Sequence, residues 1–228
     1  MEISFSSEHS SISQRNLAFQ AMAVDIQMRR DFAPAWGFEP WPCSAYLSIT
    51  GLDKSLYHPV FFMDNIGDNA LGFHDDLLNY IYSRVMTPVD PNDASTASHE
   101  AVEMRADPDC SLYAMMADGR EVAVETGDPV EADSYVIPVT LVGETRGIWV
   151  SNFVLPSYFI PGSHGPWDHL GQLTGPAPHM TPGGYVILRD PASGEVSNVF
   201  ADRRGARSLS MKRGDPLSRT GRRLALSR

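Results

Sequence analysis

The chain has 228 residues, of which 43% are hydrophobic and 20% are charged, so it is long and apolar enough to form one large folded domain. It contains no run of about 18 apolar residues, and its first residues lack the basic and apolar regions of a secretory signal, so we expect no membrane partner. The net charge of −10 is unevenly distributed. Residues 1–200 hold 9 basic and 26 acidic side chains, whereas residues 201–228 hold 9 and 2. We therefore predict a domain over 1–200 and a basic C-terminal tail over 201–228.

The first predicted element is an amphipathic helix over residues 11–31, where apolar residues recur at steps of three and four. Ser11 and Gln14 have the spacing of a capping box, in which each side chain bonds to a backbone N–H at the start of a helix. Pro34 is predicted to mark the exit from this helix, because proline is poorly tolerated in a helix interior.

Strands are predicted next, at residues 45–49 and 57–63. The stretch 71–86 is ambiguous. Its apolar residues recur at helical spacing, but the run from Tyr80 to Tyr82 also suits a strand. Residues 87–95 are rich in Pro, Asp, Asn and Ser and are predicted to form a loop.

A second helix is predicted from Ser95 or Thr96, because either hydroxyl can cap the first turn. It should end near Ala106 or Asp107, since Pro108 disfavours a helical conformation in the residue before it. The rest of the domain is predicted to be rich in β-structure, with strands at 121–125, 135–142, 147–155, 184–188 and 195–200. The long segment 160–183, rich in Gly, Pro and His, is predicted to be a loop and a candidate functional surface.

The second helix carries the pattern H-E-x-x-E at His99, Glu100 and Glu103. Residues four apart share a face of a helix, so His99 and Glu103 could bind one metal ion from the same side. Glu100, one step round the helix, could act as a general base toward water at that ion. This is the mechanical basis of the H-E-x-x-H zinc motif, and Glu103 offers an oxygen ligand in place of the second histidine.

These residues resemble the gluzincins, a family of zinc peptidases in which a glutamate downstream of the motif is the third ligand. The resemblance implies that Glu125 binds Zn²⁺ and that Asp128, in the pattern E-x-x-D, orients His99. The metzincins suggest another mapping, with Asp109 as the third ligand. Asp107 could compete for that role, although its position before Pro108 favours a role in ending the helix.

A closer resemblance, over residues 12–200, is to uncharacterised zincin-like proteins of bacteria and bacteriophages. It is carried by segments that occur in the same order, at 33–36, 97–100, 103–104, 106–108, 125–131, 150–153 and 182–185. It implies an α+β zincin-like fold with a mixed β-sheet, an N-terminal helix, a metal-binding active-site helix and a β-rich C-terminal part. A substrate peptide would lie along an edge strand upstream of that helix, within 56–64 or 78–86.

The loop after residue 157 could supply a group that stabilises an oxyanion, and the candidates are Tyr158, His164 and His169. His74 is interpreted as a loop residue and not as a ligand. The basic tail could contact nucleic-acid phosphates, an acidic neighbouring subunit or a neighbour in a virion, through Arg203, Arg204, Arg207, Arg213, Arg222 and Arg223.

The leading functional prediction is a zinc-dependent metallopeptidase that hydrolyses a peptide or protein substrate by means of water activated at the metal ion. The alternative is a bacteriophage virion or assembly protein that retains a degenerate zincin fold without catalysis. The expected location is cytoplasmic or virion-associated.

Overall fold

The computed structural model describes residues 1–53, 55–66, 71–77 and 80–202. Its architecture is α+β, as the sequence predicts. The arginines of the predicted basic tail, from Arg203 onward, lie outside the described residues.

The N-terminal half is built on a mixed five-stranded sheet with the order β2-β1-β3-β5-β4. Strands β1, β2, β3 and β5 run parallel, and β4 pairs antiparallel with β5 at one edge. The strands comprise β1 (Glu2–His9), β2 (Cys43–Tyr46), β3 (Tyr57–Met63), β4 (Gly72–Leu77) and β5 (Tyr80–Met86).

This sheet resolves one ambiguity and corrects one prediction. The ambiguous stretch 71–86 contributes two strands, β4 and β5, and no helix. The stretches 56–64 and 78–86 were expected to provide the edge strand, but β3 and β5 lie inside the sheet, and β4 is the edge beside β5. Strand β1 was not predicted, although its buried Ile3 and Phe5 alternate with serines.

The first helix, α1 (Gln14–Gln27), differs from its prediction at both ends. The Ser13 side chain caps it by accepting the N–H of Asn16, so Ser11 is not the cap. The helix also continues past Gln27 through a π-helical turn, Met28–Phe32, into α2 (Ala33–Trp36). Pro34 therefore lies inside α2 and does not end the helix. Pro34 directly follows the π-helical turn, in which the N–H of Ala33 bonds to the carbonyl of Met28 five residues back, and proline itself has no N–H to donate.

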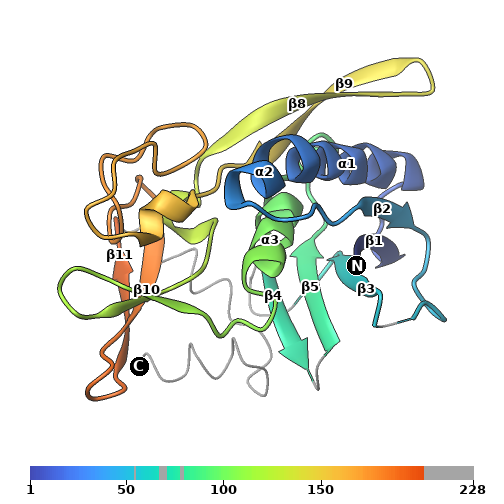
Figure 1. Cartoon of the computed structure of the whole chain (residues 1–228). Coiled ribbons are helices and arrows are strands. Elements are labelled where there is room, and N and C mark those ends of the chain that lie inside the picture. Colours follow the sequence, from blue (N-terminus) through green and yellow to red (C-terminus); the bar gives the residue numbers. More distant parts are fainter. Residues whose placement is uncertain (54, 67–70, 78–79, 203–228) are drawn as a thin grey trace.

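The second predicted helix, α3 (Ser95–Ala106), has the expected bounds. Its N-cap residue is Ala94, and the Asp93 carboxylate accepts both the N–H and the hydroxyl of Ser95. Helix α3 packs against β4 and β5, whereas α1 packs against β2. Figure 1 shows both helices between this sheet and a long hairpin formed by β8 (Ser134–Leu141) and β9 (Glu144–Ser151). The largest apolar core joins all three layers.

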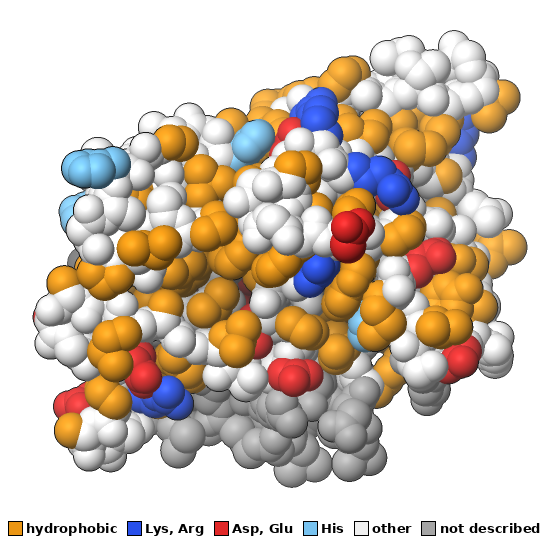
Figure 2. Space-filling model, in the orientation of Figure 1, with side chains coloured by type: hydrophobic (Ala, Val, Ile, Leu, Met, Phe, Trp, Pro, Cys, Tyr) orange, Lys and Arg blue, Asp and Glu red, His pale blue; other side chains and the backbone are white. Residues whose placement is uncertain are grey.

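The C-terminal half adds an antiparallel four-stranded sheet with the order β11-β10-β7-β6. A 3-10 helix, Asp128–Val130, leads from β7 toward the long hairpin, and another, Pro156–Phe159, precedes the loop 160–183. The bounds of the strands are β6 (Tyr113–Met115), β7 (Glu121–Ala123), β10 (Tyr185–Arg189) and β11 (Val196–Phe200). Among the described residues on the face shown in Figure 2, acidic side chains are scattered among hydrophobic and polar ones and form no continuous patch.

Acidification is expected to destabilise the fold through His58, which is 3% exposed on β3 and stacks on Trp41 with ring centroids 4.7 Å apart. Burial lowers the pKa of His58 from 6.5 to about 4. The unfolded chain therefore takes up a proton below pH 6.5 that the folded chain takes up only near pH 4. Stability present above pH 6.5 is lost as the pH falls through this window, by about 3 kcal/mol.

Urea unfolding of wild type and His58→Gln between pH 7 and pH 4 measures this loss. The difference in stability between the two proteins should shrink toward pH 4, because only the wild type carries the buried ring. His164→Gln, a change at an exposed histidine, is the control and should keep the wild-type pH dependence. If the free energies of unfolding of wild type and His58→Gln changed with pH in the same way, the loss of stability could not be assigned to His58.

Candidate metal centre

The H-E-x-x-E residues of α3 are almost completely buried, with His99, Glu100 and Glu103 exposed by 4%, 1% and 2%. Burial of ionised carboxylates is costly unless cations or hydrogen-bond donors compensate their charge. These residues belong to two sets of side chains, each centred on one histidine, and the two sets share Glu103.

The first set is centred on His99. The Nε2 atom of its ring lies 3.1 Å from Oε1 of Glu103 and 3.3 Å from Oδ1 of Asp128, on the 3-10 helix Asp128–Val130. The other ring nitrogen, Nδ1, lies 3.5 Å from Oε2 of Glu131. One nitrogen of His99 thus faces two carboxylates, and the opposite nitrogen faces a third.

The second set is centred on His74, which lies on β4 and is 4% exposed. Its Nδ1 lies 3.3 Å from Oε2 of Glu100 and 3.4 Å from Oε2 of Glu103, and its Nε2 lies 4.0 Å from Oε2 of Glu125. Burial alone would lower the pKa of His74. The nearby Cys110, Glu100 and Glu103 outweigh that effect, so the pKa of His74 stands well above its ordinary value.

Both sets could hold a metal ion. In each of two groups, His74 with Glu100 and Glu103 and His99 with Asp128 and Glu131, donor atoms lie within 4.8 Å of one another. Two ligands about 2.1 Å from a tetrahedral ion lie about 3.4 Å apart. The separations of 3.1 to 3.4 Å between each histidine nitrogen and its two facing carboxylates match that value.

A glycine brings the Asp128 segment close to α3. A Cβ atom on Gly127 would lie 2.4 Å from Nδ1 of His99, so only glycine lets the backbone lie against the imidazole ring. The N–H of Gly127 also donates to Oε1 of Glu103 over 3.0 Å. Gly184 allows a similar close approach to the 3-10 helix Asp128–Val130. A Cβ atom on Gly184 would lie 2.3 Å from the carbonyl oxygen of Pro129.

Gly127→Ala is therefore expected to push the His99 ring out of position. Overpacking of this kind costs about 1–3 kcal/mol of stability, and displacement of a ligand should also weaken metal binding. Urea unfolding and zinc titration of the purified variant measure the two effects. Ala132→Ser, an exposed change in the same loop, should stay within about 0.5 kcal/mol of wild type. A Gly127→Ala variant with wild-type zinc affinity would show that the ring is not held by this contact.

A small cavity of about 100 Å³ reaches these residues and is lined by His99, Glu100 and Glu131 among others. The Oε1 atom of Glu100 is buried and has no hydrogen-bond partner among the described residues. A larger cavity of about 520 Å³ shares the lining residues Leu71, Ser95 and Thr96 with the small one. The two cavities therefore adjoin at the start of α3.

The alternative third ligands suggested by the sequence are Asp109 and Asp107. Asp109 is exposed, and the carboxylate of Asp107 accepts the backbone N–H groups of Ser111 and Leu112 in the turn after α3. Glu125, the third ligand that the gluzincin resemblance implies, lies just after β7 and not on that strand, and its Oε2 approaches Nε2 of His74. Asp128 faces the same nitrogen of His99 as Glu103 does.

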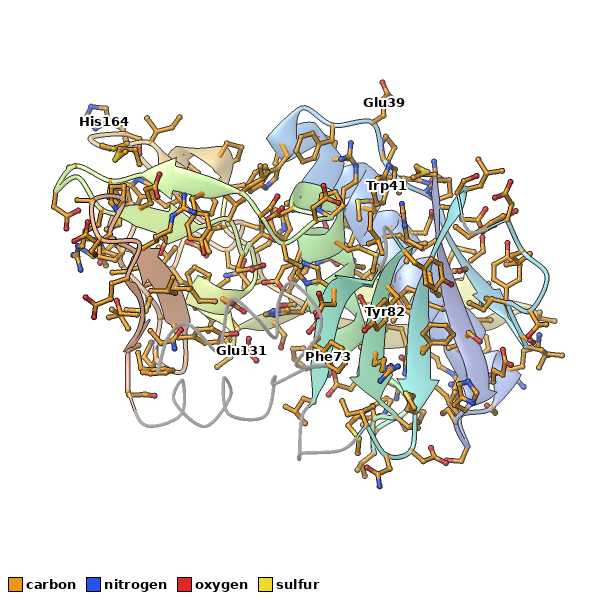
Figure 3. All side chains as sticks on the ribbon, turned by 90° about the horizontal axis from the view of Figure 1, so that it is seen from below. Glu39, Trp41, Phe73, Tyr82, Glu131 and His164 are labelled. Atoms are coloured by element: carbon orange, nitrogen blue, oxygen red, sulfur yellow. The ribbon has the colours of Figure 1, made fainter. Side chains whose placement is uncertain are left out.

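The three oxyanion candidates have other surroundings. The Tyr158 hydroxyl donates to the carbonyl of His179, and burial, together with the charge of Asp128, raises the pKa of the phenol well above its ordinary value. His169 stacks on Phe153 with ring centroids 4.9 Å apart. His164 is exposed, and Figure 3 shows it at the outer edge of the molecule, well separated from Glu131.

Two residues of the centre were not recognised in the sequence. His74 was interpreted as a loop residue, but it lies on β4, where pairing with β5 sets it opposite Ser83. Glu131, three residues after Asp128, was not considered as a contact of His99. The buried thiol of Cys110, which is in no disulfide with another described residue, donates to the carbonyl of His74 over 3.8 Å, and Cys110 has a positive φ of 49°.

The structure thus defines an α+β protein with buried histidine and carboxylate groups that could hold a metal ion. No protein-family model, curated protein or solved structure matches the chain. Within the described part of the chain, no helix is long and apolar enough to cross a membrane.

Proposed function

We propose that this chain is a zinc-dependent metallopeptidase with a zincin-like fold. The observation that carries the proposal is the convergence of Glu103 and Asp128 on one nitrogen of His99 at the spacing of a zinc site. One imidazole and two carboxylates form a ligand set that zinc accepts. We assign the third ligand to Asp128 in place of Glu125, because Asp128 faces His99 directly.

The arrangement of the sheet supports this proposal. The antiparallel edge strand β4 packs beside α3, the helix that carries H-E-x-x-E. An extended peptide can bind by adding a strand to the edge of a sheet. Substrate would therefore lie along β4, and its scissile bond would reach the start of α3 through the adjoining cavities.

In this proposal, the residues of the centre have separate roles in hydrolysis. His99, Glu103 and Asp128 would hold the zinc ion, and Glu131 would orient the His99 ring through Nδ1. A bound zinc ion polarises a carbonyl group and lowers the pKa of water. Glu100 would take the proton from the attacking water on its buried Oε1 and deliver it to the leaving amine.

Peptide cleavage by the zinc-loaded chain tests this function. We expect hydrolysis of some members of a quenched fluorescent peptide library, and we expect His99→Ala to abolish it. Glu39→Gln, a change at an exposed carboxylate remote in sequence from the motif, should leave cleavage unchanged. A zinc-loaded wild type that cleaves no peptide or unfolded protein would overturn the peptidase proposal.

One observation favours a second candidate, a bacteriophage virion or assembly protein that keeps the metal for stability. The side chains of His74, His99 and Glu103 are all less than 5% exposed, which leaves a substrate little access to an ion held there and suits a structural metal. In this case the basic tail would dock on an acidic neighbour in an assembly. Deletion of residues 201–228 should then block assembly, whereas Glu100→Gln should not.

A further inference from the structure

The two histidine sets repeat one pattern. In each, one ring nitrogen faces two carboxylates at 3.1–3.4 Å, and the other nitrogen faces a further carboxylate at 3.5 or 4.0 Å. We propose that the chain binds two divalent cations, the second at His74 and Glu100, with Glu103 bridging both ions. This extends the proposed function, with which it shares the ion at His99, its ligand Glu103 and the base Glu100. Glu100 would bind the second ion through Oε2, which lies beside His74, and Oε1 would act as the base.

Glu103 is oriented as a bridging ligand requires. Its Oε1 lies 3.1 Å from Nε2 of His99, and its Oε2 lies 3.4 Å from Nδ1 of His74. The two oxygens of one carboxylate therefore face different histidines. Ions that share such a bridge in two-metal sites lie about 3.5–4 Å apart.

The number of donor side chains in the set favours two ions over one. Two histidines and five carboxylates make up the centre: His74, His99, Glu100, Glu103, Glu125, Asp128 and Glu131. Zinc binds four ligands in most protein sites, so one ion would leave at least three of these seven side chains outside its coordination. A second ion at His74 accounts for the rest of the set.

An independent observation points to a ligand beside Glu100. Its Oε2 faces His74, whereas its Oε1 is buried with no hydrogen-bond partner among the residues described. Glu100 also lines the cavity of about 100 Å³, together with His99 and Glu131 of the first set. A buried carboxylate oxygen without a protein partner calls for a cation or a water molecule.

The outer carboxylates complete the pattern. A histidine that binds a metal usually donates its other N–H to a carboxylate, which fixes the tautomer and the orientation of the ring. Glu131 faces Nδ1 of His99 in this way, and Glu125 faces Nε2 of His74. Glu125, which the sequence suggested as a ligand, is thus a positioning residue for the second ion.

Zinc stoichiometry of the full chain tests the proposal. After loading with zinc alone and desalting, elemental analysis should give two ions per chain for wild type and one each for His74→Ala and His99→Ala. X-ray absorption at the zinc edge of the wild type should show zinc–zinc scattering at about 3.5–4 Å. His58→Gln changes another buried histidine of the same sheet and should retain both ions.

Glu125→Gln keeps the shape of the side chain and guards against misfolding of His74→Ala. It should weaken the second ion by about 10–100-fold and leave the first unchanged. One ion in the wild type, or two ions that survive His74→Ala, overturns the proposal. A wild type that binds one ion and cleaves peptides would leave the peptidase proposal standing. A wild type that binds two ions and cleaves no peptide would overturn only the peptidase proposal.

Discussion

Removal of metal with EDTA at pH 7 is expected to lower the free energy of unfolding by about 4 kcal/mol relative to zinc-loaded protein. This value applies when the free ion exceeds its dissociation constant a thousandfold, because an ion that binds only the folded state stabilises it by mass action. The structural reason is the close packing of buried carboxylates. Glu100 and Glu103 both lie against one nitrogen of His74, and unfolding separates these ligands, so the ion binds the folded chain alone.

Thermal or urea unfolding with and without chelator measures this stabilisation. The control is the double variant His74→Ala with His99→Ala, whose stability should not respond to EDTA because both histidine ligands are absent. Zinc added back after chelation should restore the wild-type value. Identical unfolding curves for chelated and zinc-loaded wild type would contradict a metal in the buried centre.

The helix that bears the motif was predictable from local chemistry. Pro108 limits α3 at its C-terminus, and polar residues before Thr96 start it, so its bounds follow from the sequence. Strand β3 also has the predicted bounds. The first helix was harder, because a π-helical turn carries the chain smoothly from α1 into α2 through Pro34. No local sequence signal used in the prediction distinguishes that turn from a helix end.

The sheet was only partly predictable. The alternation of Ile3 and Phe5 with serines is a strand signal, so β1 could have been found. The stretch that forms β4 and β5 was ambiguous, because Leu77, Leu78, Ile81 and Val85 recur at helical spacing in the sequence. Which strand forms the edge depends on the order of the strands, and strand order is a property of the whole chain.

The metal centre was also only partly predictable, because some of its contacts lie within one helix and others depend on the tertiary fold. Residues four apart on a helix must share a face, so His99 and Glu103 could be paired from the sequence. Asp128 could be found as a carboxylate downstream, although its exact approach to His99 depends on Gly127. His74 could not be found, because only the pairing of β4 with β5 and its packing on α3 bring it to Glu100 and Glu103.

Glu100→Gln is expected to reduce kcat for peptide hydrolysis by about 10²–10⁴-fold while the ion at His99 is retained. Glutamine keeps the shape of the side chain and can still accept hydrogen bonds, but its amide cannot take a proton from water. The Oε1 atom of Glu100 is the buried oxygen without a partner among described residues, and Glu100 lines the cavity with His99, which suits the role of base.

Steady-state rates and zinc content, measured on the same preparations, separate the loss of the base from the loss of metal. The proposed mechanism requires a fall in kcat with zinc still bound at His99, and Glu39→Gln should keep the wild-type rate. A Glu100→Gln variant with wild-type kcat would show that another group acts as the general base. A variant that loses zinc at His99 together with its activity would instead make Glu100 a residue on which that site depends.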